Sequence, residues 1–124
     1  MIRILVIGSA LRSVCGDQAA LGLTFLEETR TAPRYRLYAL DDRFAALVED
    51  RERGVAIDGE LVEIAEERFA EILASEPPGI TQAPVELEDG RTVSAAFGDA
   101  ELLAERAVEI TAYGGFAAYL DARR

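Results

Sequence analysis

The chain has 124 residues, half of them apolar, and its 13 basic and 23 acidic residues give a net charge of −10. This length predicts a single domain, residues 1–124, whose core can bury roughly two thirds of the unfolded chain's surface without disulfides. Because an acidic surface repels phosphate backbones and anionic bilayers, we expect neither nucleic acid nor a membrane as a partner.

The first half of the chain is expected to be mainly β-strand. Residues 2–7 form a β-branched apolar run that suits a strand buried on both faces, and Gly8-Ser9 ends it in a turn. Residues 13–23 are expected to be a loop with one helical turn. Four further strands are expected, the second and third joined by a turn at Asp41-Asp42, at residues 24–31, 34–40, 44–48 and 55–64.

The second half supplies the helices. Residues 65–76 show helical periodicity, with one face formed by Ala65, Phe69, Ile72, Leu73 and Glu76. A hairpin is expected at 81–87 and 92–97, then helices at 102–108 and after Gly114-Gly115. This order of elements predicts an α+β fold, a small mixed β-barrel with flanking helices.

The residue types that are missing limit the chemistry. The chain has no histidine and no lysine, which excludes imidazole acid–base catalysis, Ser-His-Asp and Cys-His nucleophiles, lysine Schiff bases and serine–lysine triads. With Cys15 as its single cysteine, a zinc site is not expected either, and we expect no metal and no cofactor. Any reaction would therefore depend on carboxylates, tyrosines, arginines or backbone N–H groups.

The same features bear on location and assembly. No window approaches about 20 consecutive apolar residues, and no signal-like segment is recognised, so a cytoplasmic protein is expected. A lone cysteine agrees with a reducing compartment. The small apolar stretch Ala95-Ala96-Phe97 and the C-terminal tail suggest a homodimer.

Glu76 is the carboxylate that the pattern singles out, because it extends the apolar face of its helix. A carboxyl group that faces a core has a raised pKa and can carry a proton near neutral pH. The Gly8-Ser9-Ala10 turn could face it and bind an anion through backbone N–H groups. The alternative stays open, because a residue before proline is pushed out of the helical region and Glu76 could point into solvent.

Other polar residues have simpler interpretations. Glu60 and Glu63 are expected to face solvent on opposite faces of their strand. Arg12 could hold a carboxylate, although an exposed arginine is the default. Tyr38 is a candidate ligand contact, although a core aromatic with a satisfied hydroxyl is the more common role.

Four segments in order resemble the C-terminal domain of allophanate hydrolase, a domain of the gamma-glutamylcyclotransferase-like superfamily. They are residues 31–40, residues 54–57 with Gly59-Glu60-Leu61, residues 85–91, and residues 109–120. The resemblance implies a small β-barrel fold, a catalytic glutamate at about Glu76, and substrate contacts from the turn after the first strand. The family's Tyr-Gly-Ser/Thr-Leu turn is replaced by Ile-Gly-Ser-Ala in this sequence. The implied substrate-binding residues, with Tyr38 added, are Ile7, Gly8, Ser9, Ala10, Leu11, Arg12 and Tyr38.

The resemblance implies a stand-alone relative that binds, and could decarboxylate or hydrolyse, a small anionic amide or carbamate such as N-carboxycarbamate in urea or allophanate metabolism. Two alternatives follow from the same resemblance. The chain could be a non-catalytic partner that docks on a separate amidase, or a gamma-glutamylcyclotransferase in which Glu76 deprotonates the substrate amine.

Overall fold

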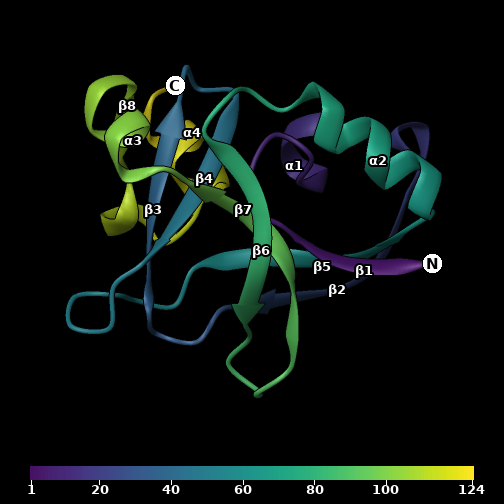
Figure 1. Ribbon diagram of the computed structural model, residues 1–124, viewed down its shortest axis with the longest axis horizontal. Helices are drawn as coiled ribbons and strands as arrows, with labels where there is room; N and C mark the ends of the chain where they lie inside the picture. The colour runs from purple at the N-terminus through teal and green to yellow at the C-terminus, as the bar shows by residue number, and fades with distance from the viewer.

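A computed structural model describes residues 1–124 and contains one eight-stranded sheet with short helices at its margins (Figure 1). The helical elements are α1 (Arg12–Cys15), α2 (Glu66–Ser75), α3 (Ala100–Arg106), α4 (Phe116–Ala122), and the 3-10 turns η1 (Ala19–Leu21) and η2 (Thr111–Tyr113). The strands are β1 (Ile2–Val6), β2 (Leu23–Arg30), β3 (Tyr35–Leu40), β4 (Phe44–Glu49), β5 (Asp58–Ile64), β6 (Ile80–Glu86), β7 (Thr92–Gly98) and β8 (Ala107–Glu109).

The sheet is mixed, and β1 lies near its middle. Strand order is β2-β5-β1-β7-β4-β3-β8, with β6 paired to β7 outside this path. β1 runs antiparallel to β5 and parallel to β7, so it is an inner strand, and its last three residues are buried whereas Arg3 is exposed. The fold is mixed α and β, as expected. The end strands β2 and β8 do not pair with each other, so the sheet is not closed and the expected barrel is not confirmed.

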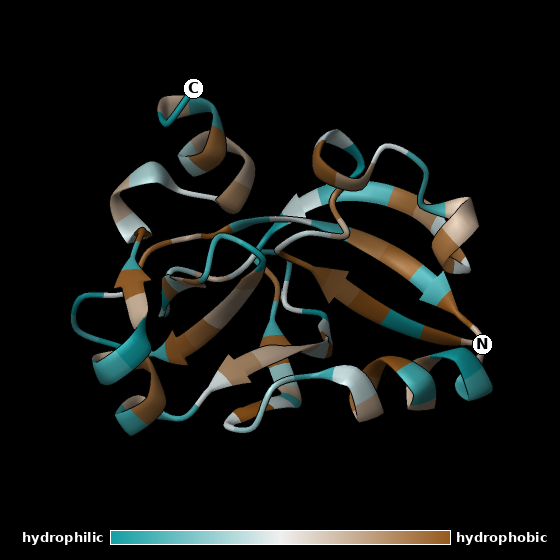
Figure 2. Cartoon of the chain, turned by 90° about the horizontal axis from the view of Figure 1, so that it is seen from above, coloured by the Kyte–Doolittle hydropathy of each residue, from teal (hydrophilic) through white to brown (hydrophobic).

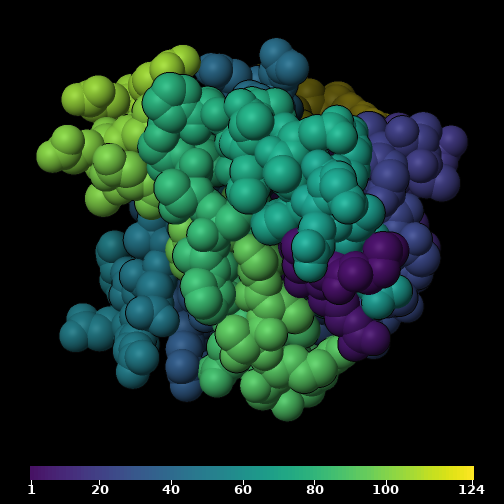
Figure 3. All heavy atoms as spheres, turned by 45° about the vertical axis from the view of Figure 1, so that its right-hand side comes forward, coloured from purple at the N-terminus to yellow at the C-terminus, as the bar shows by residue number.

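Helix α2 covers the sheet beside β1, and it positions Glu76. Phe69 and Ile72 pack against the main core, and Figure 2 shows apolar and polar bands alternating along this helix. In the space-filling view α2 (teal) lies against the N-terminal strand (purple) (Figure 3). Leu73 was expected on the buried face of this helix, and that prediction was wrong. Its side chain is 41% exposed, because the helix buries only a narrow stripe.

Strand pairing changed several expected boundaries. β5 begins at Asp58 rather than at Val55, which makes only an isolated bridge to Tyr35. The helix expected at residues 102–108 is α3, which begins at Ala100 and ends at Arg106. The next residues form β8, which pairs with β3. Ala95 is fully buried, so it cannot contribute to the exposed apolar surface expected for a dimer. None of the helices has the length and apolar character needed to cross a bilayer.

The β3–β4 hairpin is tied to the C-terminal helix. Asp41 and Asp42 both have positive φ, 55° and 53°, in a tight turn that suits a twisted hairpin. The Tyr119 hydroxyl of α4 donates to Asp42 Oδ1 at 2.7 Å. This contact fixes the hairpin whose second strand, β4, contributes to the site described next.

Candidate functional site

A cavity of about 330 Å³ brings Glu76 and the turn after β1 together. Its walls are mostly apolar, with polar groups from the turn, from α2 and from β6. Concave sites with apolar walls and a few converging polar groups are typical of small-molecule binding. The cavity is lined by Ile4, Leu5, Val6, Ile7, Gly8, Ser9, Ala10, Leu21, Leu23, Phe44, Ala45, Arg68, Ile72, Ser75, Glu76, Gln82 and Ala96.

The turn after β1 offers free backbone donors to this cavity. The Leu11 N–H donates to the Gly8 carbonyl at 3.0 Å and closes the turn, whereas the Ser9 and Ala10 N–H groups donate to no other group of the protein. Gly8 packs closely against β4, since a Cβ there would lie 3.1 Å from both the Cβ and the backbone nitrogen of Ala45. Neighbouring free N–H groups of this kind can bind an anion.

Glu76 follows the last residue of α2 and takes an extended conformation, with φ −71° and ψ 145°. This is the conformation expected of a residue before proline, yet the side chain stays half-buried against the cavity. Burial raises the pKa of the Glu76 carboxyl, and a hydrogen bond from Gln82 Nε2 to Oε1 at 3.0 Å opposes that rise. The net shift is upward, which favours a protonated carboxyl closer to neutral pH.

Arg68 is the one cationic side chain that lines the cavity. Its Nε donates to the Leu21 carbonyl at 2.9 Å, and its Nη1 pairs with Glu71 at 3.1 Å on the outer side of the helix. Gly22, with φ +81°, lets the loop pass the Arg68 stem, because a Cβ there would lie 3.1 Å from Arg68 Cγ. Arg68 thus places a positive charge among the residues that line the cavity, where it favours an anionic ligand.

Glu60 supports the turn from behind, and the expectation that it faces solvent was wrong. It is 8% exposed and accepts hydrogen bonds from the Arg12 backbone at 3.0 Å, from Arg12 Nε at 3.0 Å and from Gln18 Nε2 at 2.8 Å. Gln18 Nε2 also donates to the Ala10 carbonyl at 2.8 Å. Val62 and Ile64 lie on the same strand face as Glu60 and are buried. Their apolar character at alternate positions is the sequence signal that could have indicated a buried Glu60.

Leu11 and Arg12 therefore do not line the Glu76 cavity. Leu11 lines a separate cavity of about 430 Å³, which also contains Glu28, Asp58 and Glu60. Arg12 pairs with Glu60 and Glu28, and its guanidinium lies 3.6 Å from the centre of the Phe25 ring.

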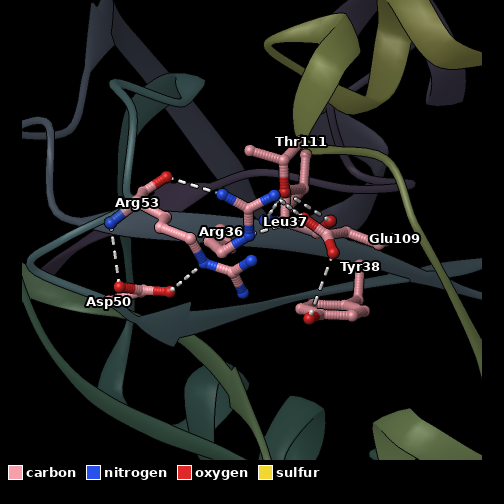
Figure 4. Close-up of polar contacts among 7 residues, drawn as sticks. All are labelled: Arg36, Leu37, Tyr38, Asp50, Arg53, Glu109 and Thr111. Atoms are coloured by element: carbon pink, nitrogen blue, oxygen red, sulfur yellow. Dashed lines mark hydrogen bonds and ion pairs between the residues drawn. The ribbon is translucent and has the colours of Figure 1, made fainter.

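Tyr38 lies in a different place from the other predicted ligand contacts. Its hydroxyl donates to Glu109 Oε1 at 3.5 Å, and Arg36 Nε donates to Glu109 Oε2 at 2.6 Å (Figure 4). Arg36 Nη1 also donates to the Arg53 carbonyl at 2.6 Å. This network joins β3 to β8, so Tyr38 acts structurally there rather than at the cavity.

Of the predicted residues, the structure thus places Ile7, Gly8, Ser9, Ala10 and Glu76 around one cavity. Sequence reasoning missed Arg68 and Gln82 there. Arg68 carried no pattern that separates it from a solvated helix residue, and the position of Gln82 depends on strand pairing.

Nearly the whole chain matches a known family. The model of the allophanate hydrolase C-terminal domain matches residues 2–121. The chain belongs to this family. A curated relative, the urea amidolyase of Lachancea kluyveri, is 28% identical over 131 residues, which cover 97% of this chain and 7% of that protein.

Solved structures show the same fold in two contexts. A uropathogenic E. coli-specific protein is 29% identical, with a TM-score of 0.85 over 97% of this chain and 95% of that chain. The Kluyveromyces lactis urea amidolyase has a TM-score of 0.87 at 24% identity, over 99% of this chain and 8% of that chain. The fold of this allophanate hydrolase C-terminal domain relative therefore occurs both as a chain of similar size and as a small part of a long enzyme.

Proposed function

We propose that this chain binds a small anionic amide or carbamate in the Glu76 cavity, and that Glu76 transfers a proton as the ligand breaks down. One observation carries the proposal: a single cavity contains a carboxyl with a raised pKa, two free backbone N–H groups and an arginine. Membership of the allophanate hydrolase C-terminal domain family supports a role related to urea or allophanate nitrogen metabolism.

N-carboxycarbamate fits this chemistry as a substrate. It carries two carboxylates on one nitrogen, so a cationic rim and free N–H groups suit it. Loss of carbon dioxide breaks one C–N bond and leaves the electron pair on nitrogen, which must take up a proton. Protonated Glu76 supplies that proton, becomes a carboxylate and is reprotonated from water, while carbamate and carbon dioxide leave. No metal, cofactor or histidine is needed in this scheme.

In the experiment that tests this proposal, the substrate is generated in the assay by a second enzyme. Allophanate is treated with a separate amidase that lacks a C-terminal domain, and the release of carbon dioxide is followed with and without this chain. We expect acceleration by the wild type and a loss of about 10²–10⁴-fold in Glu76→Gln, the usual contribution of a general acid. Glu63→Gln is the control, because Glu63 pairs with Arg3 outside the cavity. Equal rates for wild type and Glu76→Gln would refute catalysis by Glu76.

A non-catalytic docking role is the second candidate, and the coverage of the relatives favours it. The matched region is 7% and 8% of two urea amidolyases, so this fold occurs in the same polypeptide as other enzyme domains. Docking predicts that the chain co-purifies with a separately encoded amidase and that Glu76→Gln leaves the complex and its activity unchanged.

The predicted superfamily relationship supplies a third test. A gamma-glutamylcyclotransferase would release 5-oxoproline from gamma-glutamyl amino acids, with Glu76 accepting the amine proton.

A homodimer and a cytoplasmic location are retained as proposals. Ala95 is buried whereas Ala96 and Phe97 are partly exposed, so those two residues and the C-terminal tail are the surfaces proposed for the dimer.

A further inference from the structure

The two carboxylate oxygens of Glu76 have different surroundings. Oε1 accepts the hydrogen bond from Gln82 Nε2 at 3.0 Å. Oε2 makes no hydrogen bond, and it is not sealed from solvent, since the one buried side-chain oxygen without a partner belongs to Gln18. Glu76 lines the cavity, so Oε2 is the oxygen available to a ligand.

The Gln82 amide makes hydrogen bonds at both ends, with its oxygen toward Ser94 and its NH₂ group toward Glu76. The Ser94 hydroxyl on β7 donates to Gln82 Oε1 at 2.9 Å. Gln82 on β6 lies opposite Ala96, two residues beyond Ser94, so all three share one face of the sheet. With its oxygen occupied by Ser94, the amide presents its NH₂ group to Glu76. An NH₂ group only donates, so the oxygen that it meets must be an acceptor.

We propose that Ser94 and Gln82 are positioning residues that keep Glu76 Oε1 as an acceptor, so that the transferable proton is carried on Oε2 at the cavity. This inference rests on the proposed function, because it specifies which oxygen of the same carboxyl reacts. The step then moves the proton from Oε2 to the ligand nitrogen and leaves the carboxylate charge next to the Gln82 NH₂ group. A charge-assisted hydrogen bond stabilises that product state.

The arrangement is more than a surface contact between strands. Gln82 and Ser94 are both partly buried, and Gln82 lines the cavity beside Glu76. Thr81, the preceding residue on β6, is exposed and faces the other way. Arg68 is the other charged residue that lines the cavity, and it lies toward the opposite end of α2, so Gln82 is the polar group that directly contacts Glu76.

The test follows the Glu76 carboxyl and the Gln82 side-chain amide by NMR as pH is varied. In the wild type we expect both signals to titrate with one midpoint. Gln82→Leu removes a donor to the charged form and raises the pKa of Glu76 above the wild-type value. Ser94→Ala reduces the change of the Gln82 side-chain amide signal with pH. Ser94→Thr, which keeps a hydroxyl, preserves that change. Thr81→Ala is the control for changes in β6, and backbone amide spectra show that each variant is folded.

The proposal is overturned if Gln82→Leu leaves the Glu76 titration unchanged, or if Ser94→Ala matches the wild type. Neither readout requires turnover, so this failure differs from failure of the proposed function. Coupled titrations together with an active Glu76→Gln variant would support the positioning chain and refute catalysis by Glu76.

Discussion

Glu60 holds Arg12 through both of its carboxylate oxygens, one on the backbone N–H and one on the guanidinium, each at 3.0 Å. The pair links β5 to the first residue of α1, directly after the turn that carries Ser9 and Ala10. Gln18 adds a bond to the same carboxylate and a bond to the Ala10 carbonyl. The turn that lines the cavity, with its free Ser9 and Ala10 N–H groups, is thus anchored at the Ala10 carbonyl and at the Arg12 N–H.

Removing this anchor should lower stability. Glu60→Ala leaves the Arg12 N–H without its acceptor and removes one of the two bonds that Gln18 Nε2 donates, so we expect the free energy of unfolding to fall by about 2–3 kcal/mol. The estimate is kept below that of a fully buried pair, because the Arg12 side chain is 43% exposed. Urea denaturation measures the loss. Glu28→Ala removes the exposed partner of Arg12 and should cost about 0.5 kcal/mol or less; equal costs for the two variants would contradict the anchoring role.

The raised pKa of Glu76 makes a prediction about stability and pH. Burial raises the folded-state pKa above the ordinary value, so the unfolded chain ionises first and stability falls as pH rises between the two pKa values. Below both values the carboxyl is protonated in both states and contributes no difference. Glu76→Gln should therefore be at least as stable as the wild type at neutral pH, and this advantage should disappear in acid.

Thermal unfolding of both proteins over a pH series measures this difference. A Glu76→Gln variant that is less stable than the wild type at neutral pH would show that the folded protein stabilises the ionised carboxylate, which contradicts a pKa raised by burial.

The close approach of Gly8 to β4 predicts an intolerant position. Gly8→Ala would place a Cβ 3.1 Å from the Cβ and the backbone nitrogen of Ala45, and a central strand cannot move aside freely. We expect a loss of about 1–3 kcal/mol, as for other overpacked sites, together with weaker ligand binding. Ala45→Gly in the same chain removes one of the two contacts and should restore part of the stability. Additive effects of the two changes would contradict direct packing.

Arg68 should set the preference for anions. Arg68→Gln is expected to weaken the binding of malonate by about tenfold, the value of one charge-assisted hydrogen bond at a partly exposed site, and to leave binding of neutral malonamide unchanged. Titration calorimetry of both ligands measures this. Arg3→Gln is the matched control, since Arg3 pairs with Glu63 away from the cavity. An equal loss for both arginine variants would indicate a general charge effect.

Much of the fold follows from local patterns. The apolar run of β1, the Asp41-Asp42 turn and the proline pair after α2 each act within a few residues, so the sequence predicts them well. Strand β8 was missed because its three residues extend only by pairing with β3.

Residues of the site could be predicted from the sequence where their position depends on a single helix or strand. They could not be predicted where their position depends on which strands pair. Glu76 and the Gly8-Ser9-Ala10 turn follow from a helix end and a strand end. Gln82 reaches Glu76 only because β6 pairs with β7 beside the end of α2. Tyr38 was predicted to contact the ligand but lies outside the Glu76 cavity, beside Glu109 of β8. Its position on β3 gives no information about the pairing with β8.

The most direct test of the proposed site is where malonate binds, followed by NMR in the wild-type protein. We predict that the Ser9 and Ala10 amide signals and the Glu76 carboxyl signal shift together and saturate at one malonate concentration. Shifts confined to Glu28 and Asp58 of the other cavity, or no shift at Glu76, would contradict the claim that this carboxyl and the turn form one binding site.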